Sequence, residues 1–381
     1  MKVTVSISRI LVGALFIFSG LVKAIDPLGL AYKMQEFFEV WAADGYFKSL
    51  MDWLHKYATG FSVFMIALEV VLGVALLIGW QKKLTTWLLL LLTLFFTFLT
   101  SFVLFSGKIR ACGCFGDCIP LTPIQTFSKD IILTILIICI LVGQKYIQPL
   151  FKTITGSIIV LLSLIAVLWL QFYVLKHLPV KDCLPYKIGN NIIELRKMPA
   201  DAVQDKYEYS FMYEKNGEKK EFKVTGLPDS TWKFVERKEV LIQKGKNNTP
   251  LINDFTFTTE SGNDTTENIL NQTGEYYLLF IKEFPGDAEW SATISFLATR
   301  DKSKPLYVIT AQRKEMNEML NFGRDPVGVP VFSCDGTAIK TAARTNPALF
   351  LMQGPVILDK KSWVDFKSIT HLGGFKGMTN K

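Results

Sequence analysis

The chain has 381 residues, of which 50% are hydrophobic and 13% aromatic, and its formal net charge is +8. This apolar average excludes a wholly soluble protein. The apolar residues lie almost entirely before residue 176, and the remainder is typical of a soluble region of about 200 residues. The basic residues form no stripe with interleaved aromatic residues, so nucleic acid is not an expected partner.

Apolar stretches before residue 176 are long enough to predict a bundle of four to five transmembrane helices. A span needs about 20 apolar residues. The first stretch starts near Val5 and is followed by no signal-peptide cleavage site, so we expect it to be retained. The fourth is short unless residues 123–127 lengthen it. The five stretches are residues 10–22, 61–80, 84–105, 131–142 and 154–175.

Residues 26–59 are mixed in polarity and rich in aromatic side chains. This composition suits an amphipathic segment lying at the membrane interface. A helical segment that caps the bundle explains it equally well. Both interpretations stay open at this point.

Basic residues orient the spans. With five helices, the N-terminal residues Lys2 and Arg9, the turn at residues 82–83 and the connection at residues 145–152 all fall on one side. The positive-inside rule makes that side cytoplasmic. The loop near residue 115 and the region after residue 176 then face outward, where disulfides persist.

Residues 111–120 form a loop that contains three of the six cysteines, Cys112, Cys114 and Cys118. A disulfide between Cys112 and Cys114 would close a very small ring, and strained disulfides are the more oxidising ones. Cys118 would then act as the resolving thiol. The alternatives are a structural disulfide and, less favoured, a zinc site. The C-x-C spacing is unusual for zinc, and only His55 would complete the ligands, so we predict no metal.

Two ionisable residues lie within the apolar stretches. Glu69 sits in the middle of the second span, where a carboxylate is costly unless it is protonated, paired or facing water, and Lys23 lies near the outer end of the first span. They are predicted to support the thiol site or to relay its protons. A purely structural ion pair between the two helices is the alternative.

Four short sequence strings carry a family resemblance. Together they resemble the DoxX/MauE-like membrane proteins, and the likeness is greatest to the large Bacteroidetes-type members with an extra C-terminal domain. The resemblance covers the first 150 residues. The strings are SRILVG at residues 8–13, FSGLVK at 18–23, EVVLG at 69–73 and CGCFG at 112–116.

The resemblance implies a four-helix membrane core. Together with the charge pattern, it predicts a bacterial inner-membrane protein with its C-terminal domain in the periplasm. MauE is associated with maturation of a disulfide-rich periplasmic subunit of methylamine dehydrogenase, and other DoxX-like proteins are linked to quinone-coupled sulfur oxidation. The expected partners are the lipid bilayer and a periplasmic protein client or complex subunit. No cofactor is evident in the sequence, and a quinone is the electron acceptor that the resemblance suggests. Methylamine use is not expected.

The C-terminal part has two patterns. Residues 207–213 alternate in polarity, as in a β-strand, and a strong turn signal follows at residues 215–218. Residues 220–224 are predicted to form the second strand of a β-hairpin. From residue 265 the pattern changes to alternating strands and helices, followed by a second hairpin at residues 348–358.

This second pattern resembles a thioredoxin-like fold. The resemblance implies a cis peptide bond at Pro347, which stands just before a predicted strand. Thioredoxins carry C-x-x-C where this chain has residues 284–290, which contain no cysteine. The domain is therefore expected to be degenerate and to act as a docking surface. Cys183 and Cys334 are predicted to form a structural disulfide, with free thiols as the alternative.

The sequence thus predicts a membrane bundle at residues 1–150, a further helix at 151–176, a β-rich connection at 177–264 and a degenerate thioredoxin-like α/β domain at 265–381. The predicted function is support of thiol-disulfide exchange, or of maturation of periplasmic clients, through the C-x-C-x3-C loop. The alternative is a non-catalytic, membrane-anchored assembly or chaperone subunit. Whether the protein is an enzyme stays open.

Overall fold

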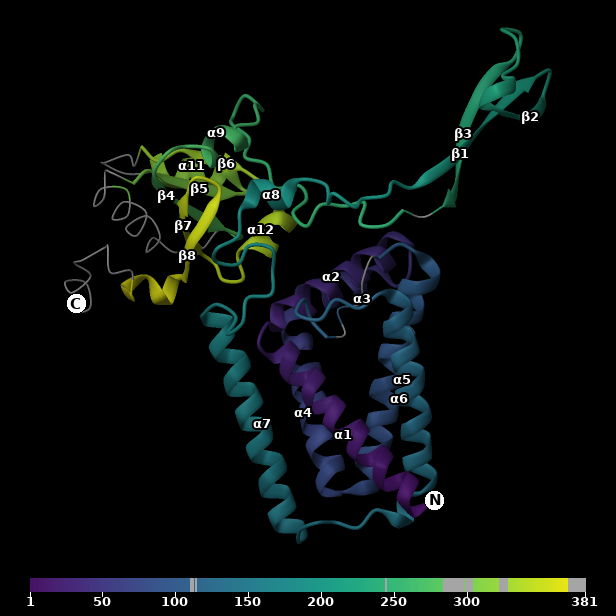
Figure 1. Cartoon of the computed structure of the whole chain (residues 1–381), viewed down its shortest axis with the longest axis vertical. Helices are drawn as coiled ribbons and strands as arrows, with labels where there is room; N and C mark the ends of the chain where they lie inside the picture. The colour runs from purple at the N-terminus through teal and green to yellow at the C-terminus, as the bar shows by residue number, and fades with distance from the viewer. Residues whose placement is uncertain are drawn as a thin grey trace.

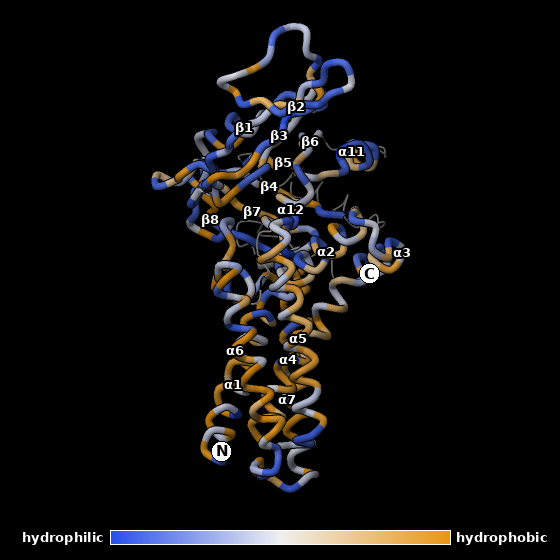
Figure 2. Tube along the Cα trace, turned by 90° about the vertical axis from the view of Figure 1, so that its right-hand side faces the viewer, coloured by the Kyte–Doolittle hydropathy of each residue, from blue (hydrophilic) through white to orange (hydrophobic). Residues whose placement is uncertain are grey.

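The computed structural model describes residues 1–109, 113, 115–243, 245–283, 298, 304–321 and 328–368. Long helices run side by side, and two β-sheets lie beyond one end of them (Figure 1). The helices are mostly hydrophobic, whereas the chain around the sheets alternates between hydrophilic and hydrophobic residues (Figure 2). The molecule therefore has a membrane part and a polar part.

Five helices of the described chain are long and apolar enough to cross a membrane, which confirms the five predicted spans as candidates. They bury a shared core of aliphatic and aromatic side chains. These helices are α1 (Lys2–Ala24), α4 (Ala58–Ile78), α5 (Lys82–Ser106), α6 (Pro123–Val142) and α7 (Thr153–Lys176).

Helix α6 starts well before its apolar run because its first turn is capped. The Thr122 side chain accepts a hydrogen bond from the Gln125 backbone N–H, and the Gln125 side chain accepts one from the Thr122 backbone N–H. Pro123 occupies the first turn, where its missing N–H costs nothing. The cap places Asp130 inside the helix and makes α6 long enough to span.

Residues 27–56 form two helices at the end of the bundle nearest the sheets (Figure 1). Helix α2 (Pro27–Ala43) buries apolar side chains, including Met34 and Phe37, in the bundle core. This part of the segment is thus the predicted capping helix. Helix α3 (Lys48–Lys56) buries no residue, and Trp53 on it is exposed. Its placement at a membrane interface stays a prediction.

Helices α1 and α4 approach each other closely at glycines. A Cβ added to Gly73 would lie 2.8 Å from the Ile17 side chain and 2.9 Å from the Gly13 carbonyl oxygen. A Cβ on Gly20 would meet Val70 at 2.5 Å. Small residues permit such contact between membrane helices, where packing replaces the hydrophobic effect as the driving force.

The basic connections meet at the other end of the bundle, as predicted. Arg9 Nε donates to the Leu76 carbonyl oxygen at 2.8 Å, and the guanidinium also donates to the Gln148 carbonyl at 3.2 Å. Lys82 Nζ donates to the Ile147 carbonyl at 3.0 Å. These bonds satisfy carbonyl groups at the end of α4 and in the connection between α6 and α7.

The first sheet is antiparallel, with strand order β2-β1-β3. Its strands are β1 (Lys206–Lys215), β2 (Glu218–Lys223) and β3 (Lys233–Gln243). Asn216 and Gly217 both have positive φ, as a two-residue hairpin turn of this kind requires. The hairpin predicted from the sequence is confirmed. In Figure 1 this sheet projects away from the rest of the polar part.

The second sheet has the order β6-β5-β4-β7-β8. Strands β4, β5 and β6 run parallel, whereas β7 is antiparallel to β4 and β8 is antiparallel to β7. Apolar clusters cover both faces, so the central strand β4 is almost wholly buried. The strands are β4 (Glu275–Ile281), β5 (Leu306–Thr310), β6 (Val331–Ser333), β7 (Ala348–Gln353) and β8 (Val356–Ser362).

Short helices flank this sheet. The predicted helix at residues 287–299 lies outside the described residues, apart from Ala298. The others are α8 (Ile192–Arg196), α9 (Thr266–Leu270), α11 (Arg313–Asn321), α12 (Gly336–Ala342) and the 3-10 turn η3 (Trp363–Ser368). Of these, α11, α12 and η3 lie where the alternating pattern predicts helices, whereas α8 and α9 were not predicted.

Gly73→Ala is expected to destabilise the bundle by about 1–3 kcal/mol, because its methyl group would force the α1 and α4 backbones apart. Gly60→Ala, in the same helix, is the matched control, since nothing lies within 4 Å of its added Cβ. It should be neutral or gain up to about 1 kcal/mol from helix propensity. Thermal unfolding of the detergent-purified chain measures both, and equal melting temperatures would contradict the close packing.

Candidate functional site

The cysteine loop lies between α5 and α6, at the end of the bundle nearest the sheets. Cys112 and Cys114 lie outside the described residues. Cys118 forms a disulfide with Cys183, with a Cα–Cα distance of 4.9 Å. The prediction that Cys118 is a free resolving thiol for the C-x-C pair is therefore wrong. Sequence spacing favoured a nearby partner, but the return of the chain after α7 brings a distant one closer.

The predicted disulfide between Cys183 and Cys334 is also wrong, because Cys183 is already paired. Cys334 is a free thiol that is 5% exposed within the apolar cluster beside the second sheet. Burial raises the pKa of the Cys334 thiol to about 12, so it stays protonated and unreactive. Cys139, the other free thiol among the described cysteines, is partly buried in α6 and packs against the bundle core.

The Cys118–Cys183 disulfide joins the cysteine loop to the segment that leads from α7 to the sheets. It closes a loop of 65 residues that contains both α6 and α7. Loop-closure entropy gives such a bond a stabilising effect of about 4 kcal/mol. The disulfide therefore holds the membrane part and the polar part together covalently at this end.

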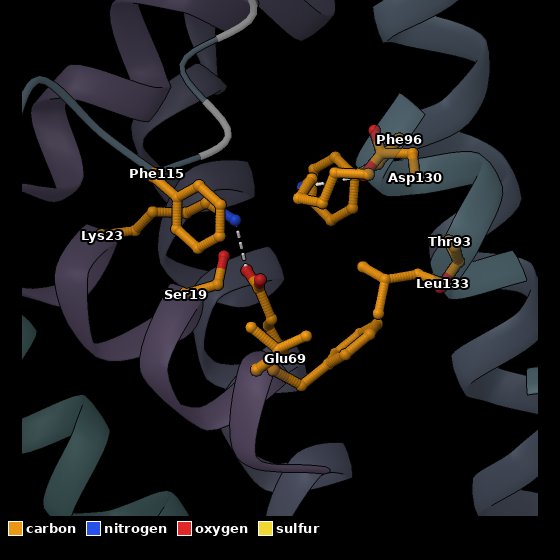
Figure 3. A pocket seen from close by; sticks show the side chains of 11 residues that line it. Ser19, Lys23, Glu69, Thr93, Phe96, Phe115, Asp130 and Leu133 are labelled. Atoms are coloured by element: carbon orange, nitrogen blue, oxygen red, sulfur yellow. Dashed lines mark hydrogen bonds and ion pairs between the residues drawn. The ribbon is translucent and has the colours of Figure 1, made fainter. Parts of the chain in front are cut away.

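Lys23 and Glu69 meet inside the bundle, next to the cysteine loop (Figure 3). Lys23 Nζ lies 2.6 Å from Glu69 Oε2, and the side chains are only 2% and 6% exposed. Lys23 Nζ also lies 4.8 Å from the centre of the Phe96 ring. The predicted proximity of these two residues is confirmed. Pairing removes much of the cost of burying either charge.

A second ion pair, which the sequence did not single out, faces the first across the same cavity. Lys129 Nζ lies 2.8 Å from Asp130 Oδ1, and Thr100 donates to Asp130 Oδ2 at 3.1 Å. Lys129 also lies over the ring of Phe115 in the cysteine loop. The capping residues Thr122 and Gln125 were the sequence feature that could have predicted this pair. A helix that starts after Thr122 includes Asp130, which the shorter predicted span did not.

The two ion pairs border a cavity of about 20 Å³, which has room for about one water molecule. Thr93 lines it and is 2% exposed, yet its Oγ1 atom makes no hydrogen bond with the described residues. A water molecule would satisfy this hydroxyl. The cavity lies beside Phe115 of the loop, and both charged pairs and apolar side chains such as Phe96 and Leu133 line it.

Arg344 connects the polar part to both the bundle and the cysteine loop. It is 4% exposed, and its guanidinium binds Asp26 at 2.9 Å and Asp117 at 2.8 Å. Asp26 lies between α1 and α2, and Asp117 precedes Cys118 in the loop. Burial raises the pKa of Asp26, and Arg344 opposes this shift. One arginine thus holds three segments together.

Lys282 lies at the same junction, after strand β4. Its Nζ donates to Tyr32 Oη at 3.1 Å and to the Arg344 carbonyl at 3.2 Å. Burial lowers the pKa of Lys282 to about 8 and raises that of Tyr32 to about 12. The surroundings at this contact between α2 and the second sheet thus favour the neutral forms of both side chains.

The Asn346–Pro347 peptide bond is cis, as predicted. Asn346 Oδ1 accepts from the Lys282 backbone N–H at 2.9 Å, and its Nδ2 donates to the Glu283 carbonyl at 2.8 Å. The proline therefore lies beside the end of β4, two residues after the Arg344–Thr345 peptide. Residues 284–290, where thioredoxins carry their C-x-x-C, lie outside the described residues.

Among the described residues, no group of three or more His, Cys, Asp or Glu side chains is arranged to hold a metal ion. The described part of the loop contributes a disulfide at Cys118 and an ion pair at Asp117.

Residues 1–143 match the family described as methylamine utilisation protein MauE. The membrane part from α1 to α6 is therefore similar to this family, whereas α7 lies outside the match. Protein TlpB of Flavobacterium psychrophilum is 32% identical over 133 residues, which are 34% of this chain and 34% of that protein. The match thus spans about a third of the curated relative, whose source is consistent with the predicted Bacteroidetes type.

Residues 207–244, which contain most of the first sheet, match a family described as a domain of unknown function (DUF8463). No solved structure matches the chain.

Glu69→Gln is expected to destabilise the protein by about 3–5 kcal/mol, because it leaves the Lys23 ammonium buried without a counter-charge. Adding Lys23→Met should restore much of that loss, since the double variant buries no charge. The measurement is thermal unfolding in detergent.

The control is Glu194→Gln, which removes an exposed ion pair with Lys197 and should cost no more than about 1 kcal/mol. If the loss of stability in the double variant equalled the sum of the losses in Lys23→Met and Glu69→Gln alone, the two residues would not be energetically coupled.

Lys282 is expected to make stability rise with pH between about 8 and 10.5. Its pKa is about 8 in the folded protein against an ordinary 10.5, so the unfolded chain binds more protons in this window. The cost of burying the charge is complete below pH 8 and is relieved above it. The melting temperature of the native chain minus that of Lys282→Met should therefore increase from pH 8 to pH 10.

Lys238→Met, which changes an exposed residue of β3, serves as the control and should give a flat difference. A difference for Lys282→Met that is flat or falls with pH would contradict the burial of this charge.

Proposed function

We propose that this chain is an inner-membrane protein that supports thiol-disulfide exchange, or the maturation of periplasmic clients, through its cysteine loop. The observation that carries the proposal is the position of the loop. Phe115 borders the cavity with the buried ion pairs, Asp117 binds Arg344, and Cys118 is bonded to Cys183. The loop is thus held between the membrane part and the sheets, where a client and a proton site are both within reach.

The proposed orientation follows from charge. The connections that contain Lys82, Lys83 and Lys145 meet at the end opposite the cysteine loop. In the proposed orientation, which the positive-inside rule supports, this basic end faces the cytoplasm and both sheets face the periplasm.

The polar part is proposed to contain a degenerate thioredoxin-like domain that binds the client. The strand order β5-β4-β7-β8, with β5 parallel to β4, β7 antiparallel to β4 and β8 antiparallel to β7, supports this fold. The cis bond at Pro347, immediately before β7, also supports it. Because the sequence has no C-x-x-C at residues 284–290, the domain would provide a surface and leave the chemistry to the loop.

Cys112 and Cys114 are the proposed exchanging pair. The thiolate of one attacks a client disulfide, which forms a mixed disulfide and releases one client thiolate. The second loop thiolate then attacks the mixed disulfide, releases the other client thiolate and leaves the loop oxidised. The client gains two electrons and the loop loses two, so the step needs no other oxidant. The reverse sequence oxidises a client dithiol.

The ion pairs beside the loop are proposed to support this chemistry. Thiolate formation at the loop releases protons, and the cavity between Glu69 and Asp130 offers carboxylates and space for a water molecule. A cavity of about 20 Å³ is far smaller than the roughly 300 Å³ of small-molecule pockets, so a quinone ring does not fit there. No step of the proposal passes through a quinone.

The second candidate is a non-catalytic assembly or chaperone subunit. The Cys118–Cys183 disulfide favours it, because this bond acts as a structural link between the two parts of the molecule. In that case the loop would position the polar part, and the sheets would bind a partner.

A redox titration of the purified full chain distinguishes the two candidates. Equilibration across a glutathione series, alkylation and mass spectrometry of the loop peptide should show a Cys112–Cys114 disulfide more oxidising than about −250 mV. Cys112→Ser/Cys114→Ser is the control and should lose this transition while Cys118–Cys183 remains. A loop that stays oxidised below about −300 mV, or never forms the bond, would refute the exchange mechanism and leave the assembly subunit.

A further inference from the structure

The basic end of the bundle contains a second, larger cavity of about 320 Å³. It lies between the turn that joins α4 to α5 and the first residues of α7. Lys82 and Lys83 line it together with apolar side chains, among them Trp80 and Phe151. Its volume is at the lower limit of about 300 Å³ for small-molecule sites. The cavity thus combines positive charge with apolar walls at the level where membrane helices end.

The described segments that form this end of the molecule contain no acidic residue to neutralise its lysines. Residues 1–25, 70–116 and 131–181 contain no Asp or Glu. They do contain Lys2, Arg9, Lys82, Lys83, Lys145 and Lys152, which all lie at or near this end. In the described part of the chain, Lys82 donates to one backbone carbonyl, and no carboxylate pairs with Lys82 or Lys83. Both side chains therefore have positive charge that is available to an anion from outside the chain.

The walls of the cavity are shaped around Trp80. Its indole Nε1 donates to Ser157 Oγ at 3.0 Å, which fixes the ring against α7. Gly156 allows this approach, since a Cβ there would lie 2.9 Å from Trp80 Cδ1. Tryptophan is typical of the level of lipid headgroups, where its polar and apolar parts are both satisfied.

Helix α7 provides an apolar surface that leads away from the cavity. Ile154, Ile158 and Leu161 follow one another at helical spacing, and each is more than half exposed. The first turn of α7 has no side-chain cap, so its backbone N–H groups face the same end of the molecule. A ligand with an anionic head and hydrocarbon chains fits both features.

We propose that this cavity binds the phosphate headgroup of an anionic phospholipid. Lys82 and Lys83 contact the phosphate, Trp80 packs against the glycerol region, and the acyl chains follow the exposed face of α7. Basic pockets between membrane helices recognise anionic headgroups in this way. The site is independent of the thiol chemistry proposed for the opposite end.

The test uses the detergent-purified full chain and native mass spectrometry with phosphatidylglycerol, phosphatidylcholine or inorganic phosphate. The native chain should retain phosphatidylglycerol at least tenfold better than phosphatidylcholine. Lys82→Gln/Lys83→Gln should lower this retention by roughly tenfold, since each lysine near a lipid surface contributes substantially to binding. Lys2→Gln/Lys145→Gln, which removes equal charge at the same end outside the cavity lining, should change it less than twofold.

Lys83→Gln alone is the variant least expected to misfold, because Lys83 is exposed and its side chain forms no ion pair with the described residues. It should still weaken phosphatidylglycerol retention several-fold with an unchanged melting temperature. Equal retention of the two lipids, or equal losses in the cavity and control variants, would overturn the proposal. Competition by millimolar inorganic phosphate as effective as that by the lipid would assign the site to free phosphate instead.

Discussion

The arrangement of this molecule depends on one buried charge that two carboxylates neutralise. Arg344 would be costly to bury alone, and its bonds to Asp26 and Asp117 bring together the second sheet, the corner between α1 and α2, and the cysteine loop. The disulfide from Cys118 to Cys183 begins one residue after Asp117. An ionic contact and a covalent bond therefore fix the same loop, and the sheets are positioned relative to the membrane helices through it.

The same requirement for pairing explains the interior of the bundle. Lys23 pairs with Glu69, and Lys129 pairs with Asp130, on either side of a cavity with room for about one water molecule. Such pairs persist in a membrane part because an isolated charge there is expensive. They also supply the carboxylates and the lysines that a proton-handling site beside a thiol loop would need. The two ion pairs could therefore stabilise the bundle and support the proposed thiol chemistry at the same time.

The two ends of the bundle differ in how their charges are balanced. Near the sheets, carboxylates of the chain itself neutralise Arg344 and other cations. At the opposite end, Lys82 and Lys83 line a cavity in a region without acidic residues. The lipid site proposed above depends on this difference, because Lys82 and Lys83 have no carboxylate partner among the described residues. Charge distribution thus separates two surfaces of one bundle.

Local patterns in the sequence determined the five long helices, the hairpin at Asn216–Gly217 and strands β4, β5, β7 and β8 of the second sheet, because length, periodicity and turn residues act over a few positions. The three-residue edge strand β6 was not predicted. Only the tertiary structure decided which cysteines pair and which charges meet. Cys118 forms its disulfide with a cysteine 65 residues away in the sequence. Asp130 lies within α6 and is buried because the capped helix begins at Pro123. Such pairings depend on how the helices pack in three dimensions. Residue spacing over a few positions does not show which distant segments this packing brings together.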